Sequence, residues 1–339
     1  MLRLPRFDLL RPKTVSEAVT ALSEAGPAAM IVAGGTDLLP NMKHELFTPD
    51  VLVSLDGIPE LRGVRETDGG GLAIGAMTSL ADVARHPAIA RRAPALSQAA
   101  GLVAGPQLRT MGTLGGNVML DTRCQWYNQT YFWRQALGFC LKKDGTLCHV
   151  VAGGRKCVAA ASNDTAPALM TLSALLVIEG PSGRRSLPVD EFWVSDGIWN
   201  KKLEPGEILT EVRIPAPAAG HRGAYGKLRE RGSIDFPLLG VAVRLDVDGA
   251  GRIADADVVV TALAARPLRI AKARALLAGR AVGEAEGAAA FEAVAAQAHR
   301  QCHPLANIPG DEDYRQEMVP VYVRRTLRAA ADGTGPVHP

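Results

Sequence analysis

The chain has 339 residues, 47% hydrophobic and 22% charged, which excludes the disordered, collagen-like and membrane-spanning classes. Its 38 basic and 35 acidic residues leave a formal net charge of +3, too even for a nucleic-acid-binding protein with a basic face. No apolar run reaches the roughly 18 residues that cross a bilayer, and residues 1–12 lack the features of a signal peptide. We therefore expect a cytoplasmic protein of two or three domains without a membrane or nucleic-acid partner.

The first segment, residues 1–60, carries alternating helix and strand signals. A helix is predicted at residues 14–19, because Thr14 can cap it and Glu17 stands three residues later. The apolar run at residues 28–33 predicts a strand that ends at a glycine pair. This segment is therefore expected to be a small α/β lobe.

The second segment, residues 61–218, predicts an α+β lobe with short strands at residues 72–76 and 174–179. Residues 121–160 interrupt it with many aromatic side chains and no clear periodicity. We interpret this stretch as an insertion that holds something other than a hydrophobic core.

The third segment, residues 219–332, follows a linker rich in proline and glycine at residues 215–220. Alternating patterns predict antiparallel strands, and alanine-rich stretches predict helices after them. The strands are expected at residues 224–231, 240–246 and 254–263, and the helices at residues 269–277, 284–299 and 311–331. This order predicts a C-terminal α+β domain, followed by a frayed tail at residues 333–339.

Two glycine loops are candidates for binding a phosphate. Gly34 and Gly35 directly follow a predicted strand, where the absence of Cβ atoms lets backbone N–H groups approach an anion. Their spacing matches neither a dinucleotide-binding G-x-G-x-x-G nor a P-loop, so a simple tight turn is an equal alternative. Gly112, Gly115 and Gly116 form the second loop. Together the loops could clamp a pyrophosphate from two sides.

Asp164 stands before an apolar helix with Pro167 in its first turn. It is either a ligand-binding carboxylate or the N-cap of that helix.

Four of the five cysteines fall in the insertion with the spacing C-x15-C-x7-C-x8-C. Four thiolates are the usual ligands of a 4Fe-4S cluster or a structural zinc ion, and zinc sites usually contain close C-x2-4-C pairs that are absent here. The spacing favours an iron-sulfur cluster, and leaves zinc and unrelated buried thiols open. Two disulfides conflict with a cytoplasmic location. These cysteines are Cys124, Cys140, Cys148 and Cys157.

The insertion also contains six basic residues, which form either an exposed rim that steers an acidic electron carrier or an ordinary solvated surface. They are Arg123, Arg134, Lys142, Lys143, Arg155 and Lys156.

The two glycine loops in this order, followed by Asp164 and by the motif at residues 205–215, resemble the FAD-binding medium subunits of the molybdenum hydroxylases, such as those of xanthine dehydrogenase and aerobic carbon monoxide dehydrogenase. Most members of that family lack a cysteine insertion. The four cysteines with their flanking residues, and residues 234–238, resemble the branch of 4-hydroxybenzoyl-CoA reductase beta subunits, which carries an extra 4Fe-4S cluster. The resemblance implies a two-lobed FAD-binding domain of the vanillyl-alcohol-oxidase (PCMH) type plus a small C-terminal α+β domain.

The resemblance also implies the site residues, position by position. The first loop would wrap the FAD pyrophosphate, the second would oppose it, and the four cysteines would ligate the cluster. Val103, Leu209 and Lys227 would lie near the flavin ring, and Asp164 would bind the polar chain of the cofactor. The first loop comprises Val32, Ala33, Gly34, Gly35, Thr36, Asp37, Leu38 and Leu39, and the second Thr113, Leu114, Gly115, Gly116 and Asn117.

The implied reaction is the reductive dehydroxylation of 4-hydroxybenzoyl-CoA to benzoyl-CoA in anaerobic aromatic degradation. Electrons from ferredoxin would enter at the 4Fe-4S cluster, pass to FAD and leave toward a small subunit with 2Fe-2S clusters. A large subunit would hold a molybdenum-pterin cofactor and the substrate, in a dimer of heterotrimers. Two alternatives remain: the flavin subunit of another molybdenum hydroxylase that oxidises an aromatic or heteroaromatic substrate, and a non-redox binding protein with structural zinc.

Overall fold

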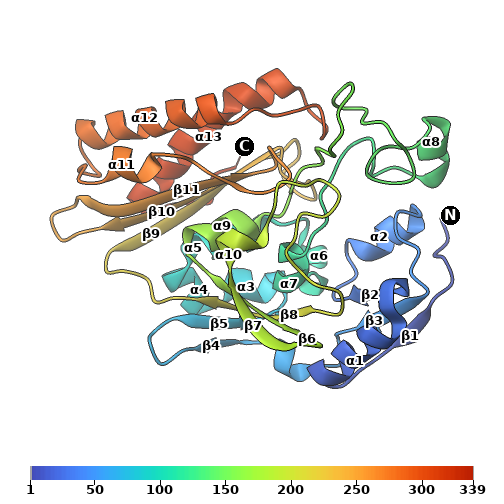
Figure 1. Ribbon diagram of the computed structural model, residues 1–339. Helices are drawn as coiled ribbons and strands as arrows, with labels where there is room; N and C mark the ends of the chain where they lie inside the picture. Colours follow the sequence, from blue (N-terminus) through green and yellow to red (C-terminus); the bar gives the residue numbers. More distant parts are fainter. Residues whose placement is uncertain (1, 339) are drawn as a thin grey trace.

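Three β-sheets follow one another along the chain in the computed structural model, which describes residues 2–338 (Figure 1). The first sheet has the order β1-β3-β2 with parallel neighbours. The helix predicted at residues 14–19 is α1, capped by Thr14, which accepts a hydrogen bond from the N–H of Glu17 (3.2 Å). The elements are β1 (Asp8–Leu10), α1 (Val15–Ala25), η1 (Gly26–Ala28), β2 (Ala29–Val32), α2 (Leu38–Lys43), β3 (Val51–Ser54) and η2 (Pro59–Leu61).

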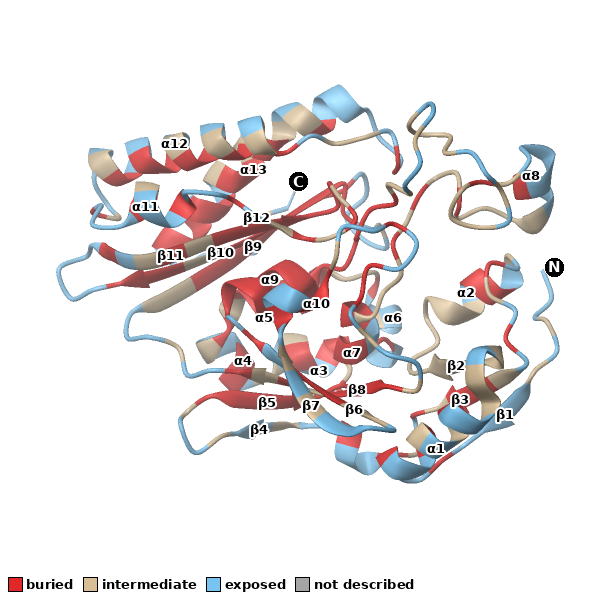
Figure 2. Ribbon diagram, in the orientation of Figure 1, coloured by how far each residue is buried: buried red, intermediate tan, exposed pale blue. Residues whose placement is uncertain are grey.

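The second sheet is antiparallel, with the order β4-β5-β8-β6-β7. The strands predicted at residues 72–76 and 174–179 are β5 and β6. Figure 2 shows buried residues concentrated in β5, β8 and α9, where the sheet and its covering helices form one core. The elements are β4 (Val64–Glu66), β5 (Leu72–Gly75), α3 (Leu80–Arg85), α4 (Pro87–Arg92), α5 (Pro94–Leu102), α6 (Pro106–Met111), α7 (Leu114–Val118), α9 (Thr165–Thr171), β6 (Leu175–Gly180), β7 (Gly183–Pro188), α10 (Val189–Phe192) and β8 (Ile208–Ile214).

The segment at residues 121–160 contains one short helix, α8 (Tyr131–Ala136), and is otherwise irregular. The expected basic rim is only partly formed there. Arg134 is buried and donates to the backbone oxygens of residues 44 and 45, and the Lys142 side chain is 4% exposed. Arg155 and Lys156 remain exposed. Arg134 and Lys142 are therefore not exposed, because the first donates to backbone oxygens and the second pairs with Asp121.

The C-terminal sheet has the order β12-β11-β10-β9 and is antiparallel, as predicted. Helices α12 and α13 lie together over one of its faces (Figure 1). The helix expected at residues 269–277 begins only at residue 273, because Arg269 pairs with Val259 in the sheet. The elements are β9 (His221–Leu228), β10 (Leu239–Val247), β11 (Ile253–Thr261), β12 (Leu268–Arg269), α11 (Ala273–Leu277), α12 (Ala285–Gln301) and α13 (Glu312–Asp332).

The C-terminal tail is not frayed, contrary to the expectation for residues 333–339. Val337 bridges to β9: its N–H donates to the Tyr225 oxygen (3.0 Å), and its oxygen accepts from the N–H of Lys227 (2.8 Å). The exposed N–H and C=O groups of the edge strand β9 explain this docking. Residue 339 lies outside the described residues.

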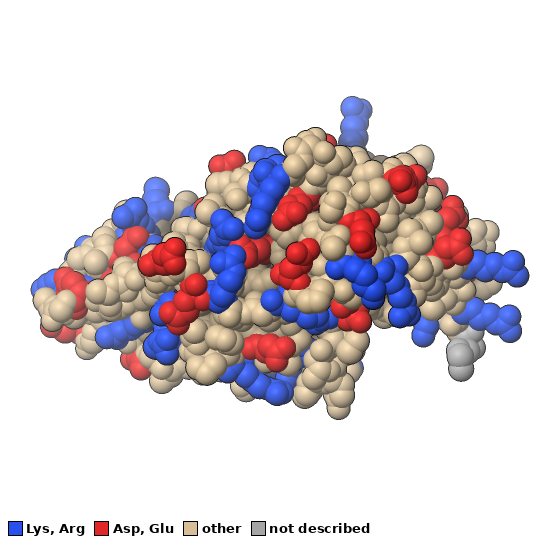
Figure 3. Space-filling view, turned by 90° about the horizontal axis from the view of Figure 1, so that it is seen from below, with Lys and Arg blue, Asp and Glu red and all other residues tan. Residues whose placement is uncertain are grey.

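The C-terminal sheet docks on the second lobe through β9 and α5. Tyr225 lies in the core of the second lobe, and its N–H donates to the side-chain oxygen of Gln98 (2.8 Å). Acidic and basic side chains are interspersed over the face of the molecule seen in Figure 3. No helix in the described part of the chain is long and apolar enough to cross a membrane.

Candidate functional site

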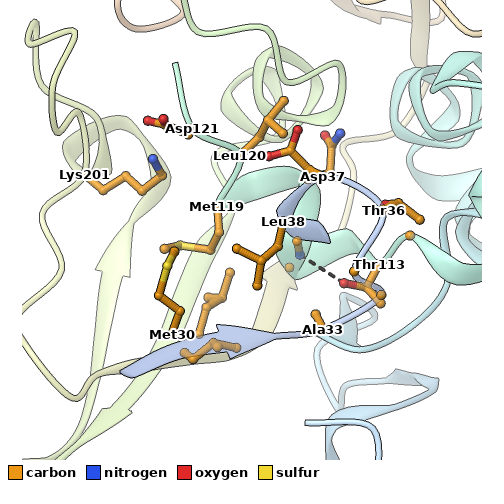
Figure 4. Close-up of a pocket in the computed structure, with 18 of the residues that line it drawn as sticks. Met30, Ala33, Thr36, Asp37, Leu38, Thr113, Met119, Leu120, Asp121 and Lys201 are labelled. Atoms are coloured by element: carbon orange, nitrogen blue, oxygen red, sulfur yellow. Dashed lines mark hydrogen bonds between the residues drawn. The ribbon is translucent and has the colours of Figure 1, made fainter. Parts of the chain in front are cut away.

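A cavity of about 870 Å³ lies where loops of the three sheets meet. Segments far apart in the sequence line it: the loop after β2, the loop before α7, residues 203–209 at the start of β8, and residues 234–236 after β9. Apolar side chains such as Met30 and Met119 face it (Figure 4). Its volume lies within the range of about 300–1,000 Å³ that is usual for small-molecule and cofactor sites.

The first glycine loop offers unpaired donors to this cavity. Within residues 2–338, the backbone N–H groups of residues 34–37 donate no hydrogen bond. A Cβ atom on Gly34 would collide with the backbone oxygen of Met111, and Gly35 has a φ of +70°. Both glycines are therefore required by the backbone itself, and consecutive free N–H groups form a cradle for an anion.

The second loop is held against the residue that follows β5 and against α9. The Thr113 hydroxyl accepts from the N–H of Gly116 (3.0 Å), and a Cβ on Gly115 would lie 2.7 Å from that of Ala76. The Asn117 side-chain oxygen accepts from the N–H (3.0 Å) and the hydroxyl (2.6 Å) of Thr165. Asn117 thus fixes the loop relative to the helix that follows Asp164.

Asp164 stands at the N-cap position of α9, as one of the two interpretations expected, but its side chain makes no capping hydrogen bond. Its Oδ1 accepts from the Tyr225 hydroxyl (2.8 Å) and its Oδ2 from the Lys227 ammonium (3.0 Å). Lys227 is fully buried and also donates to the Leu102 oxygen (2.9 Å). Burial raises the pKa of Asp164 and lowers the pKa of Lys227, while their mutual attraction opposes both shifts. The pair joins α9 to β9 directly beneath the cavity.

Most of the residues expected at the cofactor line this cavity: Ala33, Gly34, Gly35, Thr36, Asp37, Leu38, Val103, Thr113, Gly115, Gly116, Asn117, Asp164 and Leu209. Four others are absent from its lining. Lys227 is bound beneath Asp164, Leu114 is in the core of the second lobe, and the side chains of Val32 and Leu39 pack around Gly35.

Three basic residues lie in or beside the cavity wall although the sequence motifs did not place them there: Arg123, Lys142 and Lys201. The Arg123 guanidinium pairs with Asp37 (3.0 Å) and lies 3.8 Å from the centre of the Phe236 ring. The Lys142 ammonium pairs with Asp121 (2.9 Å), and Lys201 also lines the cavity. No motif marks these residues. Their only sequence signal is that Arg123 and Lys142 flank cysteines of the insertion.

The four insertion cysteines are all free thiols. Cys124 and Cys140 are buried in one apolar cluster, against which the half-buried Cys157 packs, and Cys148 is also half-buried. Burial raises the pKa of Cys124 to about 11, with smaller contributions from the nearby Cys157 and Cys140 thiols, while hydrogen bonds from the backbone of Trp126 and Tyr127 oppose the shift. Among the described residues, no three His, Cys, Asp or Glu side chains are gathered as a single metal ion requires.

The cysteine cluster and the cavity share a wall. Tyr127 is buried in the same apolar cluster as Cys124 and Cys140, and Phe47 packs against it. Both aromatic rings also line the cavity. The Lys142 ammonium lies 4.8 Å from the centre of the Tyr127 ring. A single layer of side chains therefore separates the cysteine cluster from the cavity.

The chain matches two family models: the FAD-binding domain of molybdopterin dehydrogenases over residues 5–217, and the C-terminal domain of CO dehydrogenase flavoproteins over residues 224–330. It is 35% identical to the carbon monoxide dehydrogenase medium chain of Hydrogenophaga pseudoflava, over 96% of this chain and 97% of that one. The crystal structure of carbon monoxide dehydrogenase from the same organism matches with a TM-score of 0.79 at 33% identity, covering 98% of this chain and 100% of that chain.

Quinoline 2-oxidoreductase from Pseudomonas putida 86 also matches, with a TM-score of 0.75 at 26% identity, covering 98% of this chain and 99% of that chain. The expected fold class is thereby confirmed: a mixed α and β structure with an FAD-binding domain of the PCMH type and a CO dehydrogenase flavoprotein C-terminal domain. The chain belongs to the family of FAD-binding medium subunits of the molybdenum hydroxylases.

Proposed function

We propose that this chain is the FAD and 4Fe-4S electron-transfer subunit of a molybdenum enzyme that reductively dehydroxylates 4-hydroxybenzoyl-CoA to benzoyl-CoA. In that reaction the aromatic C–O bond breaks, two electrons and two protons are taken up, and water leaves. Ferredoxin supplies the electrons. A large molybdenum-pterin subunit binds the substrate, and a small 2Fe-2S subunit carries electrons from this chain to it. The three subunits form a heterotrimer, and the cytoplasmic enzyme is a dimer of such heterotrimers. This chain relays electrons and needs no acid, base or nucleophile of its own.

In this proposal the cavity holds FAD. The free N–H groups of residues 34–37 fit a diphosphate, because they present consecutive donors that no protein acceptor uses. Thr113 and Asn117 hold the opposing loop in position. The apolar remainder of the cavity suits flat aromatic rings. When bound, FAD supplies one- and two-electron chemistry, and the protein contributes orientation and water exclusion.

The observation that carries the proposal is the wall shared by the cysteine cluster and the cavity. Cys124 and Cys140 lie in the apolar cluster to which Tyr127 belongs, and the Tyr127 ring lines the cavity. In a 4Fe-4S cube each thiolate ligates a different iron atom, so the four thiolates stand farther apart than the ligands of a single ion, and Cys124, Cys140 and Cys157, which meet in one apolar cluster, suit a cube better than one ion. The domain division at residues 60 and 218, with an insertion at residues 121–160, is part of this proposal.

A second candidate function is the flavin subunit of a molybdenum hydroxylase that oxidises an aromatic or heteroaromatic substrate. The similarity to quinoline 2-oxidoreductase along nearly the whole chain favours it. Electrons would then leave through this chain instead of entering. The two candidates differ in what reduces the flavin of the assembled enzyme: reduced ferredoxin for the first, and the heteroaromatic substrate for the second.

The test replaces one proposed cluster ligand and one cysteine elsewhere. Cys140→Ser is expected to lose its iron, to keep its FAD and to lose fast reduction of that FAD by reduced ferredoxin. Cys302→Ala, in the core of the C-terminal domain, is the matched control and should keep both cofactors. A Cys140→Ser variant with its full iron content would refute the ligand assignment. Fast flavin reduction without iron would refute the proposed route.

A further inference from the structure

Two carboxylates on the Lys201 side of the cavity are already paired with other cations. Asp37 pairs with Arg123 (3.0 Å), and Asp121 pairs with Lys142 (2.9 Å). Each carboxylate therefore already has a cation at hydrogen-bonding distance. Among the described residues, Lys201 has no carboxylate within ion-pair distance. Glu204 also lines the cavity, but it forms no ion pair with Lys201, so within residues 2–338 the Lys201 ammonium has no counter-ion in direct contact.

Lys201 is nevertheless buried. Its side chain is 3% exposed, and its ammonium donates to the side-chain oxygen of Asn200 (2.9 Å) and lies 5.0 Å from the centre of the Trp199 ring. Both partners are neutral. An isolated ammonium taken out of water is strongly unfavourable unless a negative charge accompanies it. The burial of Lys201 thus costs stability in the protein without its ligand.

The Lys201 ammonium faces the cavity. The residue lines the cavity, and Figure 4 shows it on the side of Asp121, across from Ala33 and Thr36 of the first glycine loop. Burial lowers the pKa of Lys201 to about 8, with Asp121 opposing that shift and Lys142 adding to it. A lysine in this setting has the charge, the donors and the access to meet an anion that enters the cavity.

We propose that Lys201 is a cofactor-binding residue whose ammonium neutralises negative charge on the dinucleotide that fills this cavity. The inference rests on the proposed placement of FAD there. Two parts of FAD can supply the charge: the diphosphate, which is anionic in every redox state, and the flavin ring, which gains negative charge on reduction. The second loop and Asp164 offer no cation to the cavity, because Lys227 is already bound beneath it.

The experiment uses Lys201→Met in the full chain, with Lys201→Arg to restore the charge and Lys202→Met as the control at the exposed neighbouring position. FAD-free protein is titrated with FAD and with ADP, and the reduction potential is measured on FAD-loaded protein. If the diphosphate is the partner, Lys201→Met lowers the affinities for both FAD and ADP by about 10- to 100-fold. If the flavin ring is the partner, the affinities for FAD and ADP are unchanged in Lys201→Met. The reduction potential of the bound FAD then falls by about 30 mV, which is a tenfold change in the equilibrium constant of a two-electron couple.

Lys201→Arg should recover most of either effect. The ligand-free Lys201→Met protein should also unfold at a higher urea concentration than the wild type, because a buried uncompensated charge is gone. The inference is overturned if Lys201→Met matches Lys202→Met in FAD affinity, ADP affinity and potential. It is also overturned if Lys201→Met unfolds at lower urea or does not fold, which would identify a structural lysine. Failure of the wild type to bind FAD and ADP would instead overturn the proposed function, and this inference with it.

Discussion

Replacing Lys227 by Met is expected to destabilise the protein more than any surface substitution does. The change removes the 3.0 Å partner of Asp164 and leaves that carboxylate fully buried with only the Tyr225 hydroxyl. Breaking a buried ion pair from one side costs about 3–5 kcal/mol, because the remaining charge is uncompensated. The Leu102 oxygen also loses a donor. The free energy of unfolding, measured in urea by circular dichroism, should fall by this amount.

The double variant Lys227→Met with Asp164→Asn measures how much of the loss in stability comes from the unpaired Asp164 charge. It removes both charges, so it should be more stable than Lys227→Met alone by about 1–3 kcal/mol. Burial raises the pKa of Asp164, so the lone carboxyl can stay protonated in the folded state where the unfolded chain has lost the proton, and the deficit of Lys227→Met should grow as the pH rises above the ordinary Asp value of about 3.9. A single variant within 0.5 kcal/mol of the wild type, or a double variant that recovers nothing, would refute the role of this pair in joining the domains.

Three further predictions concern other parts of the molecule. Gly34→Ala should abolish FAD binding, because its Cβ would collide with the backbone of the second loop, whereas Gly232→Ala, with open space around it, should bind FAD normally in a fluorescence titration. The pKa of Lys201 is about 8 in the folded chain against an ordinary value of 10.5, so the unfolded chain binds more protons between these two pH values. The free energy of unfolding of the ligand-free protein should therefore rise by up to about 3 kcal/mol across that interval. Urea titrations at pH 8 and 10 should show this rise in the wild type and not in Lys201→Met. Deleting residues 334–339 removes the two backbone hydrogen bonds of Val337 to β9, and should lower the melting temperature; an unchanged value would show that the tail contributes nothing.

Local patterns predicted those elements that local physics determines. The cap by Thr14 and the strands expected at residues 240–246 and 254–263 required only neighbouring residues, and both were confirmed, although β10 is buried along nearly its whole length and does not alternate between buried and exposed. The prediction of a helix from residue 269 was wrong because the partners of Arg269 are distant in the sequence. Its guanidinium pairs with Asp257 and Asp190, and these ion pairs favour a short edge strand over a helix. Hydrophobic periodicity in the sequence cannot predict ion pairs between residues that are distant along the chain.

The same division applies to the candidate site. The glycine loops were recognisable because a missing Cβ leaves a trace in the sequence, and both loops reach the cavity. The ion pair between Lys227 and Asp164, which lines the cavity, joins residues 63 positions apart and left no trace in the sequence pattern. Lys201 carried no sequence signal, because its importance arises from burial between distant segments. Conversely, the exposed basic rim was wrong for Arg134 and Lys142, whose charges the fold draws inside.

We propose an iron-sulfur cluster beside the FAD of this flavin subunit. The most direct test is to purify the chain without oxygen and to measure iron, acid-labile sulfide, zinc and FAD in the same sample. We expect four irons, four sulfides and one FAD per chain, with no zinc, from the ligand complement of a 4Fe-4S cube. One FAD without iron would contradict the cluster and leave an ordinary hydroxylase flavin subunit; zinc in place of iron would contradict it equally.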